Sequence, residues 1–540
     1  MVDPSSSSQL LSRRAVLGAG AALSAAALVG CESGQSSTEK APPAQSGVLP
    51  TYAAYAGVAP DLPAQNANSI NGFLSFPTDR PSVLTRKPNL PEPVTVLAQQ
   101  SVYVPPAMPQ NAFWQNLNDH FGVTLDISMV PGADYTQKFQ ALVAADDLAE
   151  LVRVPQVPRL NQVVTAKFAD LTEHLAGDEV KQYPMLANLP TTSWNAAMFD
   201  GKVMGVPMHL LSLGSRVEAR TDILSTLGVE AKFSTGAEFL DFCREVTDAK
   251  AQRFALVTAT STFTKQMCGV PNQWRVDNGA FVNEIETDEY KRWLELATTL
   301  WSEGLVHPQA FSNPQVALLF QAGQFLLFEV GGAGFTSAMP LYTKAAPGLT
   351  VAPVIPPKYD GGGDAAVYAG AGSNGFTAIN KTASPERIAE LLVLLDGLAA
   401  PFGTAEWLAV QYGKEGASYT WQDGVPTLTE SGAKEKVIMN YVPGSPMVMY
   451  APGYPDVTRA ECAYEAAVGE KALPLPTLGL FSDAATSTGA TLAEKIRNAT
   501  ADVITGRAQL SGWDQVVTEW RNGGGDTIRS EYEQAAAARK

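Results

Sequence analysis

Five short segments between residues 94 and 154 decide the fold: VTVLAQ at 94–99, NAFWQNLNDHF at 111–121, VTLDISMV at 123–130, YTQKFQALVAA at 135–145 and ELVRV at 150–154. The first, third and fifth are apolar runs with strand periodicity, and the other two repeat their apolar residues at helical spacing. Strands that alternate with helices in this way form βαβ units around a parallel sheet. The stretch therefore predicts an α/β fold.

The same alternation returns further along the chain. Helical patterns occur at 237–247, 288–303 and 385–398, and strand-like runs at 325–330, 349–354 and 376–379. No internal repeat of fixed period connects them. A second α/β lobe is therefore expected after the first.

Composition excludes several classes of protein. Of the 540 residues 45% are hydrophobic and 17% charged, which is enough apolar material for a large core. The formal charge of −16 repels phosphate backbones, so nucleic acid is not an expected partner. With only four His and four Cys, neither a metal site nor a disulfide scaffold is indicated, and no cofactor is expected.

The first 31 residues have the pattern of an export signal. Ser12-Arg13-Arg14 precedes an uncharged run at 15–30, which is short for a bilayer span but suits a signal peptide. The paired arginines resemble a twin-arginine signal, and Leu28-Val29-Gly30-Cys31 resembles a bacterial lipobox, in which the cysteine is acylated. An uncleaved anchor helix is the alternative. We expect a signal peptide at 1–30 and an extracellular protein whose only membrane contact is a lipid on Cys31.

Residues 31–91 are rich in Ser, Gln, Pro, Ala and Gly and poor in branched aliphatic residues. This composition buries too little apolar surface to offset the entropy of ordering. A flexible stalk is predicted, although the aromatic residues in its second half could pack on the body.

The body carries a series of motifs, at 94–99, 121–125, 146–150, FDGKVMGVP at 199–207, 219–224, 227–229, GLVHP at 304–308, 321–324, YGKEGASYT at 412–420, 423–424 and GGGDTIRSEY at 523–532. These motifs resemble the extracellular solute-binding proteins of carbohydrate ABC importers (family 1), in particular their oligosaccharide-binding lipoprotein branch. The resemblance covers about residues 92–535 and departs at Ala149, where members usually have Pro.

The resemblance implies a two-lobe, type II periplasmic-binding-protein-like fold with the ligand cleft between lobes joined by crossover strands. Lobe one would comprise 92–210 and 365–405, and lobe two 211–364 and 406–540. The implied protein is a monomeric, non-enzymatic receptor that captures an oligosaccharide and delivers it to the transmembrane subunits of an ABC permease.

Two other functions remain open on the sequence alone. A secreted carbohydrate-active enzyme would need two carboxylates that face each other, and no sequence motif of a hydrolase is present. A receptor for a peptide or another non-sugar solute is the second alternative. Gly370–Gly375 matches G-x-G-x-x-G, but a strand-like run follows where a nucleotide-binding loop needs a helix.

Sugar sites combine flat aromatic faces with planar hydrogen-bonding groups. Trp274 with Arg275, and Trp421 with Tyr419, lie in predicted loops among such groups. The expected ends of the strands add further candidates, because ligands of α/β sheets bind there. These are Gln99, Gln100, Tyr103, Gln156 and Glu329, together with His209 near the first crossover, for which a structural role is the alternative.

The other tryptophans and the cysteines have structural interpretations. Helical spacing places Trp293, Trp301, Trp513 and Trp520 in the core. Cys243 and Cys268 could form a disulfide in an exported protein, or could be buried thiols.

Overall fold

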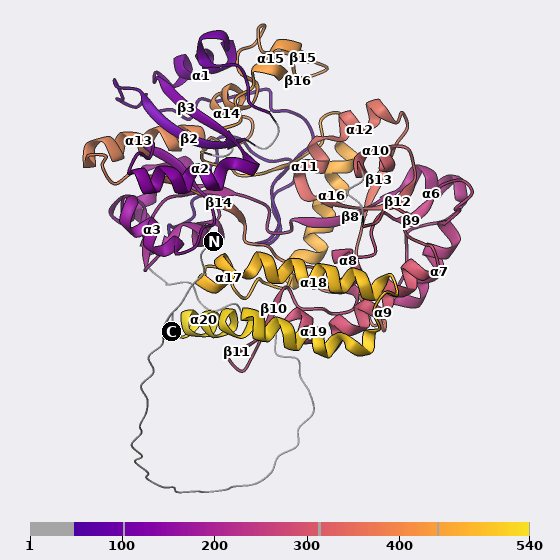
Figure 1. Cartoon of the computed structure of the whole chain (residues 1–540). Coiled ribbons are helices and arrows are strands. Elements are labelled where there is room, and N and C mark those ends of the chain that lie inside the picture. The colour runs from indigo at the N-terminus through magenta and orange to yellow at the C-terminus, as the bar shows by residue number, and fades with distance from the viewer. Residues whose placement is uncertain (1–47, 101–102, 312–314, 440–441, 539–540) are drawn as a thin grey trace, which may run out of the picture. The chain divides into compact units, whose positions relative to one another are not determined.

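The computed structural model describes residues 48–100, 103–311, 315–439 and 442–538 (Figure 1). The predicted signal peptide and Cys31 lie outside these residues. The described part contains two larger sheets, each of which is covered by helices. The α/β class expected from the alternation of strands and helices is confirmed.

The first sheet has five strands in the order β3-β2-β4-β14-β7. Their bounds are β2 (Val94–Gln100), β3 (Leu125–Pro131), β4 (Leu151–Val154), β7 (Val206–His209) and β14 (Ser373–Ile379). β2 pairs in parallel with β3 and β4, as predicted. β14 runs antiparallel to β4 and β7, because the chain returns from the second sheet and enters at the edge where β4 ends. The sheet is therefore mixed.

Both faces of the first sheet are buried. Leu97 packs with Tyr135 and Phe139 of α2 on one face, whereas Val96 and Ala98 belong to the core cluster on the other. Alternate residues of a strand point to opposite faces, which explains this division. The helices of this lobe are α1 (Ala112–Phe121), α2 (Gly132–Ala145), α3 (Leu160–Lys167), α4 (Thr172–Leu175), α5 (Pro184–Ala187), α13 (Pro385–Leu398), α14 (Ala405–Tyr412) and α15 (Glu430–Glu435).

The second sheet has the order β13-β8-β12-β9. Its strands are β8 (Ser215–Arg220), β9 (Phe254–Leu256), β12 (Phe325–Gly331) and β13 (Val351–Val354). β12 is parallel to β9 and antiparallel to β8. Four two-stranded pairs complete the strands: β1 (Gly72–Phe73) with β17 (Met449–Tyr450), β5 (Met198–Phe199) with β6 (Lys202–Val203), β10 (Trp274–Asp277) with β11 (Ala280–Asn283), and β15 (Tyr419–Gln422) with β16 (Val425–Leu428).

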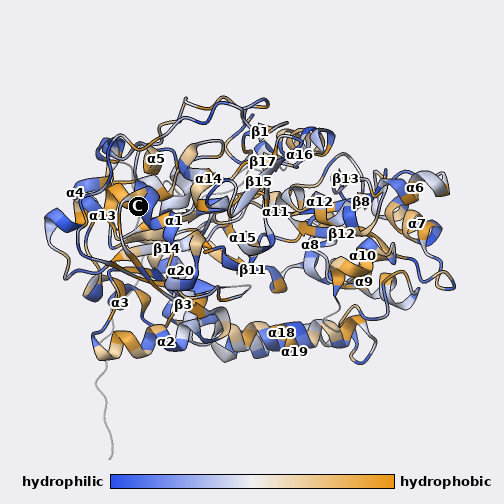
Figure 2. Cartoon of the chain, turned by 90° about the horizontal axis from the view of Figure 1, so that it is seen from above, coloured by the Kyte–Doolittle hydropathy of each residue, from blue (hydrophilic) through white to orange (hydrophobic). Residues whose placement is uncertain are grey.

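Among the remaining helices, α18 is amphipathic, as the alternating colours along it illustrate (Figure 2). Within the described ranges, no helix is both long and apolar enough to span a bilayer. The remaining helices are α6 (Thr221–Leu227), α7 (Gly236–Val246), α8 (Thr262–Met267), α9 (Asp288–Ser302), α10 (Val316–Gln321), α11 (Gly332–Ser337), α12 (Met339–Ala345), α16 (Pro455–Val468), α17 (Asp483–Ser487), α18 (Gly489–Ile504), α19 (Trp513–Trp520) and α20 (Asp526–Ala537).

Two connections between the sheets run side by side. The backbone N–H of Leu210 donates to Gly372 O at 3.0 Å, and that of Gly370 donates to Ser212 O at 2.6 Å. A third segment touches them, because a Cβ atom on Gly444 would lie 2.7 Å from the His209 backbone nitrogen. Glycine at position 444 allows this close approach of two backbones.

The stalk prediction is wrong for residues 48–91. β1 pairs with β17, and Phe73 and Phe76 are buried against Phe402. Val83 and Leu90 belong to the core of the first lobe. Thr51 and Ala53 are hydrogen-bonded to Gly177 and Ala187, and Gly72 and Phe73 contact residues more than 300 positions away. The composition of the segment itself does not reveal these partners.

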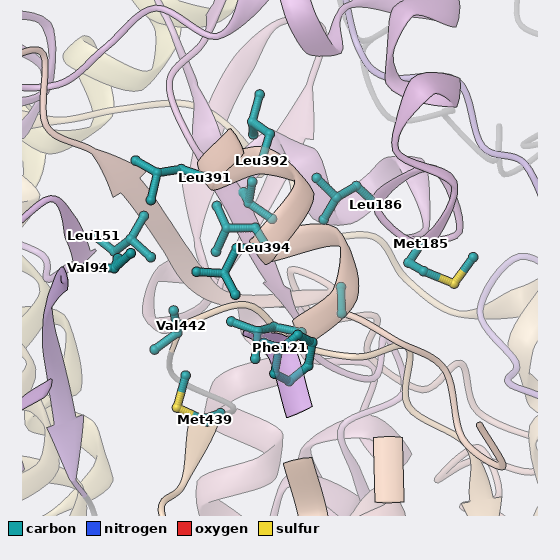
Figure 3. Close-up of a cluster of buried hydrophobic side chains, with 14 of the residues drawn as sticks. Val94, Phe121, Leu151, Met185, Leu186, Leu391, Leu392, Leu394, Met439 and Val442 are labelled. Atoms are coloured by element: carbon teal, nitrogen blue, oxygen red, sulfur yellow. The ribbon is translucent and has the colours of Figure 1, made fainter. Parts of the chain in front are cut away.

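Residues 406–439 and Val442 also pack differently from the prediction, which assigned them to lobe two. Val410, Met439 and Val442 lie in the same core cluster as Val94 and Phe121 of the first lobe (Figure 3). α14 follows α13 after a short turn and contacts α1, so the chain stays with the first sheet until about residue 442.

The core assignments of the tryptophans hold with one exception. Trp293, Trp513 and Trp520 are buried, whereas Trp301 is only half-buried. Trp301 follows Trp293 by eight residues, which turns it by about 80° around helix α9. Cys243 and Cys268 are free and buried, and burial raises the pKa of both thiols. The structure thus favours the buried thiols over the disulfide.

A buried ionic cluster joins β8 to α16. Arg216 Nε lies 2.8 Å from Glu461 Oε2, although the pair is poorly aligned for a hydrogen bond. Glu218 and Glu465 lie 3.6 Å from the same guanidinium, and all four side chains are at most 1% exposed. Burial, followed by the neighbouring Glu461, raises the pKa of Glu218 well above its usual range, and burial raises the pKa of Glu465 to about 7. One cation thus serves three carboxylates, which favours protonation.

This cluster predicts a pH-dependent stability. Because the pKa of Glu465 rises from 4.5 to about 7 on folding, the stabilisation is complete below about pH 4.5 and is lost as the pH rises through about 7. In the parent protein, the free energy of unfolding should fall between about pH 5 and pH 8. In Glu465→Gln this fall should be smaller by on the order of 3 kcal/mol. Urea denaturation at both pH values measures this effect, and an unchanged decrease in the variant would refute it.

Candidate ligand-binding site

Ligands of open α/β sheets bind beyond the carboxyl ends of the parallel strands. In the first sheet, β2 ends with Gln99 and Gln100, and β4 is followed by Gln156. β14 begins at the same edge, because Phe376 pairs with Val154 at the end of β4. These segments bring several planar polar side chains to one edge of the sheet.

Arg153 organises this edge from within β4. Its guanidinium donates one hydrogen bond to Gln99 Oε1 and another, at 3.3 Å, to the backbone oxygen of Asn374. The Tyr135 hydroxyl lies 2.7 Å from the backbone oxygen of Arg153 and 3.0 Å from that of Leu97. The sequence analysis missed Arg153, although a charge inside the apolar strand LVRV was a usable signal. Gln99 lies at the expected edge, and its carbonyl oxygen is held by Arg153.

Gln100 is the most distinctive candidate. Only 3% of its surface is exposed, yet neither its amide nitrogen nor its amide oxygen has a hydrogen-bond partner among the described residues. Burying an unpaired polar group costs roughly 1–3 kcal/mol, so an unpaired amide at this edge of the sheet is a candidate to bind a ligand. An amide both donates and accepts, which suits it to a hydroxyl group.

His209 has partners within the protein. Its Nδ1 lies 3.1 Å from Ser193 Oγ, and Ser193 Oγ donates to Gly372 O at 2.7 Å. The serine proton is therefore used, so Nδ1 must carry the proton of the imidazole. Burial lowers the pKa of His209 to about 4, which keeps the ring neutral at neutral pH. These contacts favour the structural role, in which His209 holds the connection between the sheets.

Glu329 lies near the end of β12 in the second sheet. Ser215 Oγ donates to its Oε1 at 2.8 Å, and Oε2 accepts from Ser261 Oγ and the Thr262 backbone N–H, also at 2.8 Å. The carboxylate therefore ties β8 and the start of α8 to β12. The structure gives Glu329 a positioning role at this edge.

The structure does not support Trp274 as a stacking platform. Its ring is 6% exposed and packs against Trp520 and Tyr532, at centroid distances of 5.9 and 5.7 Å. The supposed loop is the hairpin β10–β11, whose inner face is covered by α20. Arg275, on the same hairpin, pairs with Asp277 and Glu289 at the surface.

The aromatic residues near 420 are also occupied. Tyr419 is buried in a cluster with Phe76 and Trp421, and Arg80 lies over the Trp421 ring at 4.6 Å. The Tyr103 hydroxyl donates to backbone oxygens of the segment 433–436. Gln156 is exposed after β4. Within the part of the chain that the structure describes, no cluster of His, Cys, Asp or Glu is suited to hold a metal ion.

Comparisons with known proteins place the chain in a family. The polygalacturonan/rhamnogalacturonan-binding protein YtcQ of Bacillus subtilis (strain 168) is 24% identical over 436 residues, which are 76% of this chain and 85% of the relative. Lipoprotein LipO of the same organism is 22% identical over 452 residues, covering 76% of this chain and 86% of LipO.

The N-glycan transport solute binding protein of Streptococcus pneumoniae has a similar structure, with a TM-score of 0.60 at 13% identity over 83% of this chain and 98% of that chain. The fold is thus the two-lobe, type II fold of periplasmic binding proteins. A model of the bacterial extracellular solute-binding proteins matches residues 105–395, which is more than half of the 540 residues. The chain belongs to the bacterial extracellular solute-binding protein family.

Proposed function

We propose that this protein captures an oligosaccharide between its two lobes and delivers it to the permease of an ABC importer. As a member of a solute-binding family, the chain is a binding protein, not an enzyme. The observation that carries the proposal is Gln100, a buried amide without a partner among the described residues, at the edge where the ligand is expected. A sugar hydroxyl can accept from its nitrogen and donate to its oxygen at once.

The groups beside Gln100 support the same class of ligand. The Arg153 guanidinium and the Gln99 amide are planar and held together by a hydrogen bond, so little entropy is lost when they bind a ligand. The names of YtcQ and of the pneumococcal structure also refer to saccharides. A peptide is the remaining alternative, because amides can pair with a peptide backbone as well.

We also propose how the protein is attached to the cell. The pattern of residues 12–31 favours a twin-arginine signal, removal of residues 1–30 and a lipid on Cys31. The relative LipO is named a lipoprotein, which is consistent with such an anchor. The protein would then act as a monomer on the extracellular face of the membrane, with residues 92–210 and 365–442 as lobe one.

Gln100→Leu tests the proposed site. The change removes two unpaired polar atoms and keeps the volume, so the melting temperature should stay the same or rise. Affinity for the best ligand in a calorimetric panel of neutral oligosaccharides, uronate oligosaccharides and peptides should fall about tenfold or more. Gln515→Leu, at an exposed position of α19, is the matched control and should change neither quantity.

The possible results of this experiment test the position of the binding site and the class of ligand separately. Unchanged saccharide affinity in Gln100→Leu would remove Gln100 from the site. Tight binding of a peptide, with no saccharide bound by the unchanged protein, would overturn the oligosaccharide proposal itself.

A further inference from the structure

A groove of about 770 Å³ lies at the other end of the second sheet, where β9 and β12 begin. Gln324 stands directly before β12 and lines the groove, whereas Glu329 and Gly331 lie at the opposite end of the strand. At a rise of about 3.3 Å per residue, the two ends are roughly 20 Å apart. The groove is therefore distinct from the proposed ligand-binding edge.

The lining of this groove carries no formal charge from acidic or basic residues. Among the eleven described residues that line it, none is Asp, Glu, Lys or Arg, although the whole chain has a charge of −16. Anionic and cationic ligands would be buried here without a counter-charge, which is costly. The lining thus favours an uncharged ligand.

The polar groups of the groove are those that recognise hydroxyls. His307 Nδ1 accepts from the Gln309 backbone N–H at 3.2 Å, so its Nε2 carries the proton and donates to Gln324 Oε1, also at 3.2 Å. The Gln324 amide is thereby fixed, and its NH₂ group has no hydrogen-bond acceptor among the residues that the structure describes. Gln252 adds a second carboxamide at the exposed rim, where its φ is +53°.

An aromatic wall completes the groove. Trp301, half-buried on α9, and Phe254 line the groove. Phe311 lies outside this lining and meets the Trp301 ring edge-on, with the centroids 5.3 Å apart. An indole face packs well against the C–H face of a sugar ring, while the carboxamides bind its hydroxyls. The groove volume lies within the ordinary range for small-molecule sites.

We propose that this groove is an accessory site for an uncharged saccharide unit, stacked on Trp301 and hydrogen-bonded by Gln252 and Gln324. It binds independently of the ligand held between the lobes. If that ligand is itself a glycan, the second contact raises the local concentration of glycan at the receptor.

The site is tested by titration with four uncharged disaccharides: maltose, cellobiose, lactose and sucrose. Binding is followed through the indole N–H resonance of Trp301, which is identified by its absence from Trp301→Phe. We expect a saturable shift with at least one disaccharide. By saturation-transfer NMR, affinity should fall about tenfold in Trp301→Ala and much less in Trp301→Phe.

Two further variants keep the test decisive. Gln252→Asn suits the positive φ while withdrawing the amide, and should weaken binding with the melting temperature unchanged. Gln100→Leu should leave this binding intact, so failure at the main site and failure here are distinguishable. The proposal is overturned if none of the disaccharides shifts the resonance, if Trp301→Ala binds like the parent, or if glucuronate competes as well as the neutral sugars.

Discussion

Arg216→Leu is expected to lower the free energy of unfolding by about 3–5 kcal/mol, because removing one partner of a buried ion pair leaves uncompensated buried charge. Here the carboxyl groups of Glu218, Glu461 and Glu465 lose the only cation within 4 Å that the described residues supply, so each of them that is ionised stays buried without a counter-charge. The cluster joins β8 to α16, and Glu465 also accepts from the Ile70 backbone N–H at 3.0 Å. Loss of the Arg216 guanidinium should therefore destabilise the packing of the second sheet, α16 and the segment before β1 together.

Urea denaturation with a surface control measures this effect. Arg507 pairs with Asp502 at the surface, where the two side chains are 63% and 46% exposed. Arg507→Leu should therefore cost less than about 1 kcal/mol. The loss in Arg216→Leu should also shrink at acid pH, where the carboxylates are protonated. A cost of Arg216→Leu no larger than that of the control would contradict the account of the cluster.

Trp274→Ala should lower the free energy of unfolding by about 3–5 kcal/mol through the cavity that it leaves among Phe281, Trp520 and Tyr532. Ligand affinity of the folded fraction should stay close to that of the parent. This reverses the expectation from sequence, in which Trp274 stacks on the ligand.

Melting temperature and ligand titration of the same variant separate the two roles. Trp301→Ala is the matched control, because its half-exposed ring fills less of the core and should cost much less stability. If Trp274→Ala lost affinity with unchanged stability, the core assignment of Trp274 would be wrong.

The periodicity of the sequence predicts the regular elements because it records local burial. The predicted helix at 385–398 coincides with α13, and the strand at 94–99 differs from β2 by one residue. Long-range packing is not recorded in this way. Phe76 lies in a stretch of low hydrophobicity, yet Phe402 and Trp421 bury it. β14 runs antiparallel to β4 because the chain first passes through the second sheet, and no local sequence pattern indicates this path.

The sequence was sufficient to predict those site residues whose position follows from the order of strands and helices alone. Gln99 and Gln100 follow from the rule that ligands bind at strand ends, and the structure leaves both at that edge. Trp274 and Tyr419 were chosen for polar neighbours in the sequence. The distant residues Trp520 and Tyr532 cover Trp274, and Tyr419 is buried in an aromatic cluster against Tyr412 and Trp421. Helical spacing predicted a core position for Trp301. The structure shows instead that its half-exposed ring lines a groove.

Native mass spectrometry tests the central claim most directly. The exported protein is offered a mixture of oligosaccharides together with a mixture of peptides, and the mass of the bound species identifies its class. We predict a saccharide adduct whose signal Gln100→Leu weakens while Gln515→Leu does not. A peptide adduct in place of a saccharide would contradict the account.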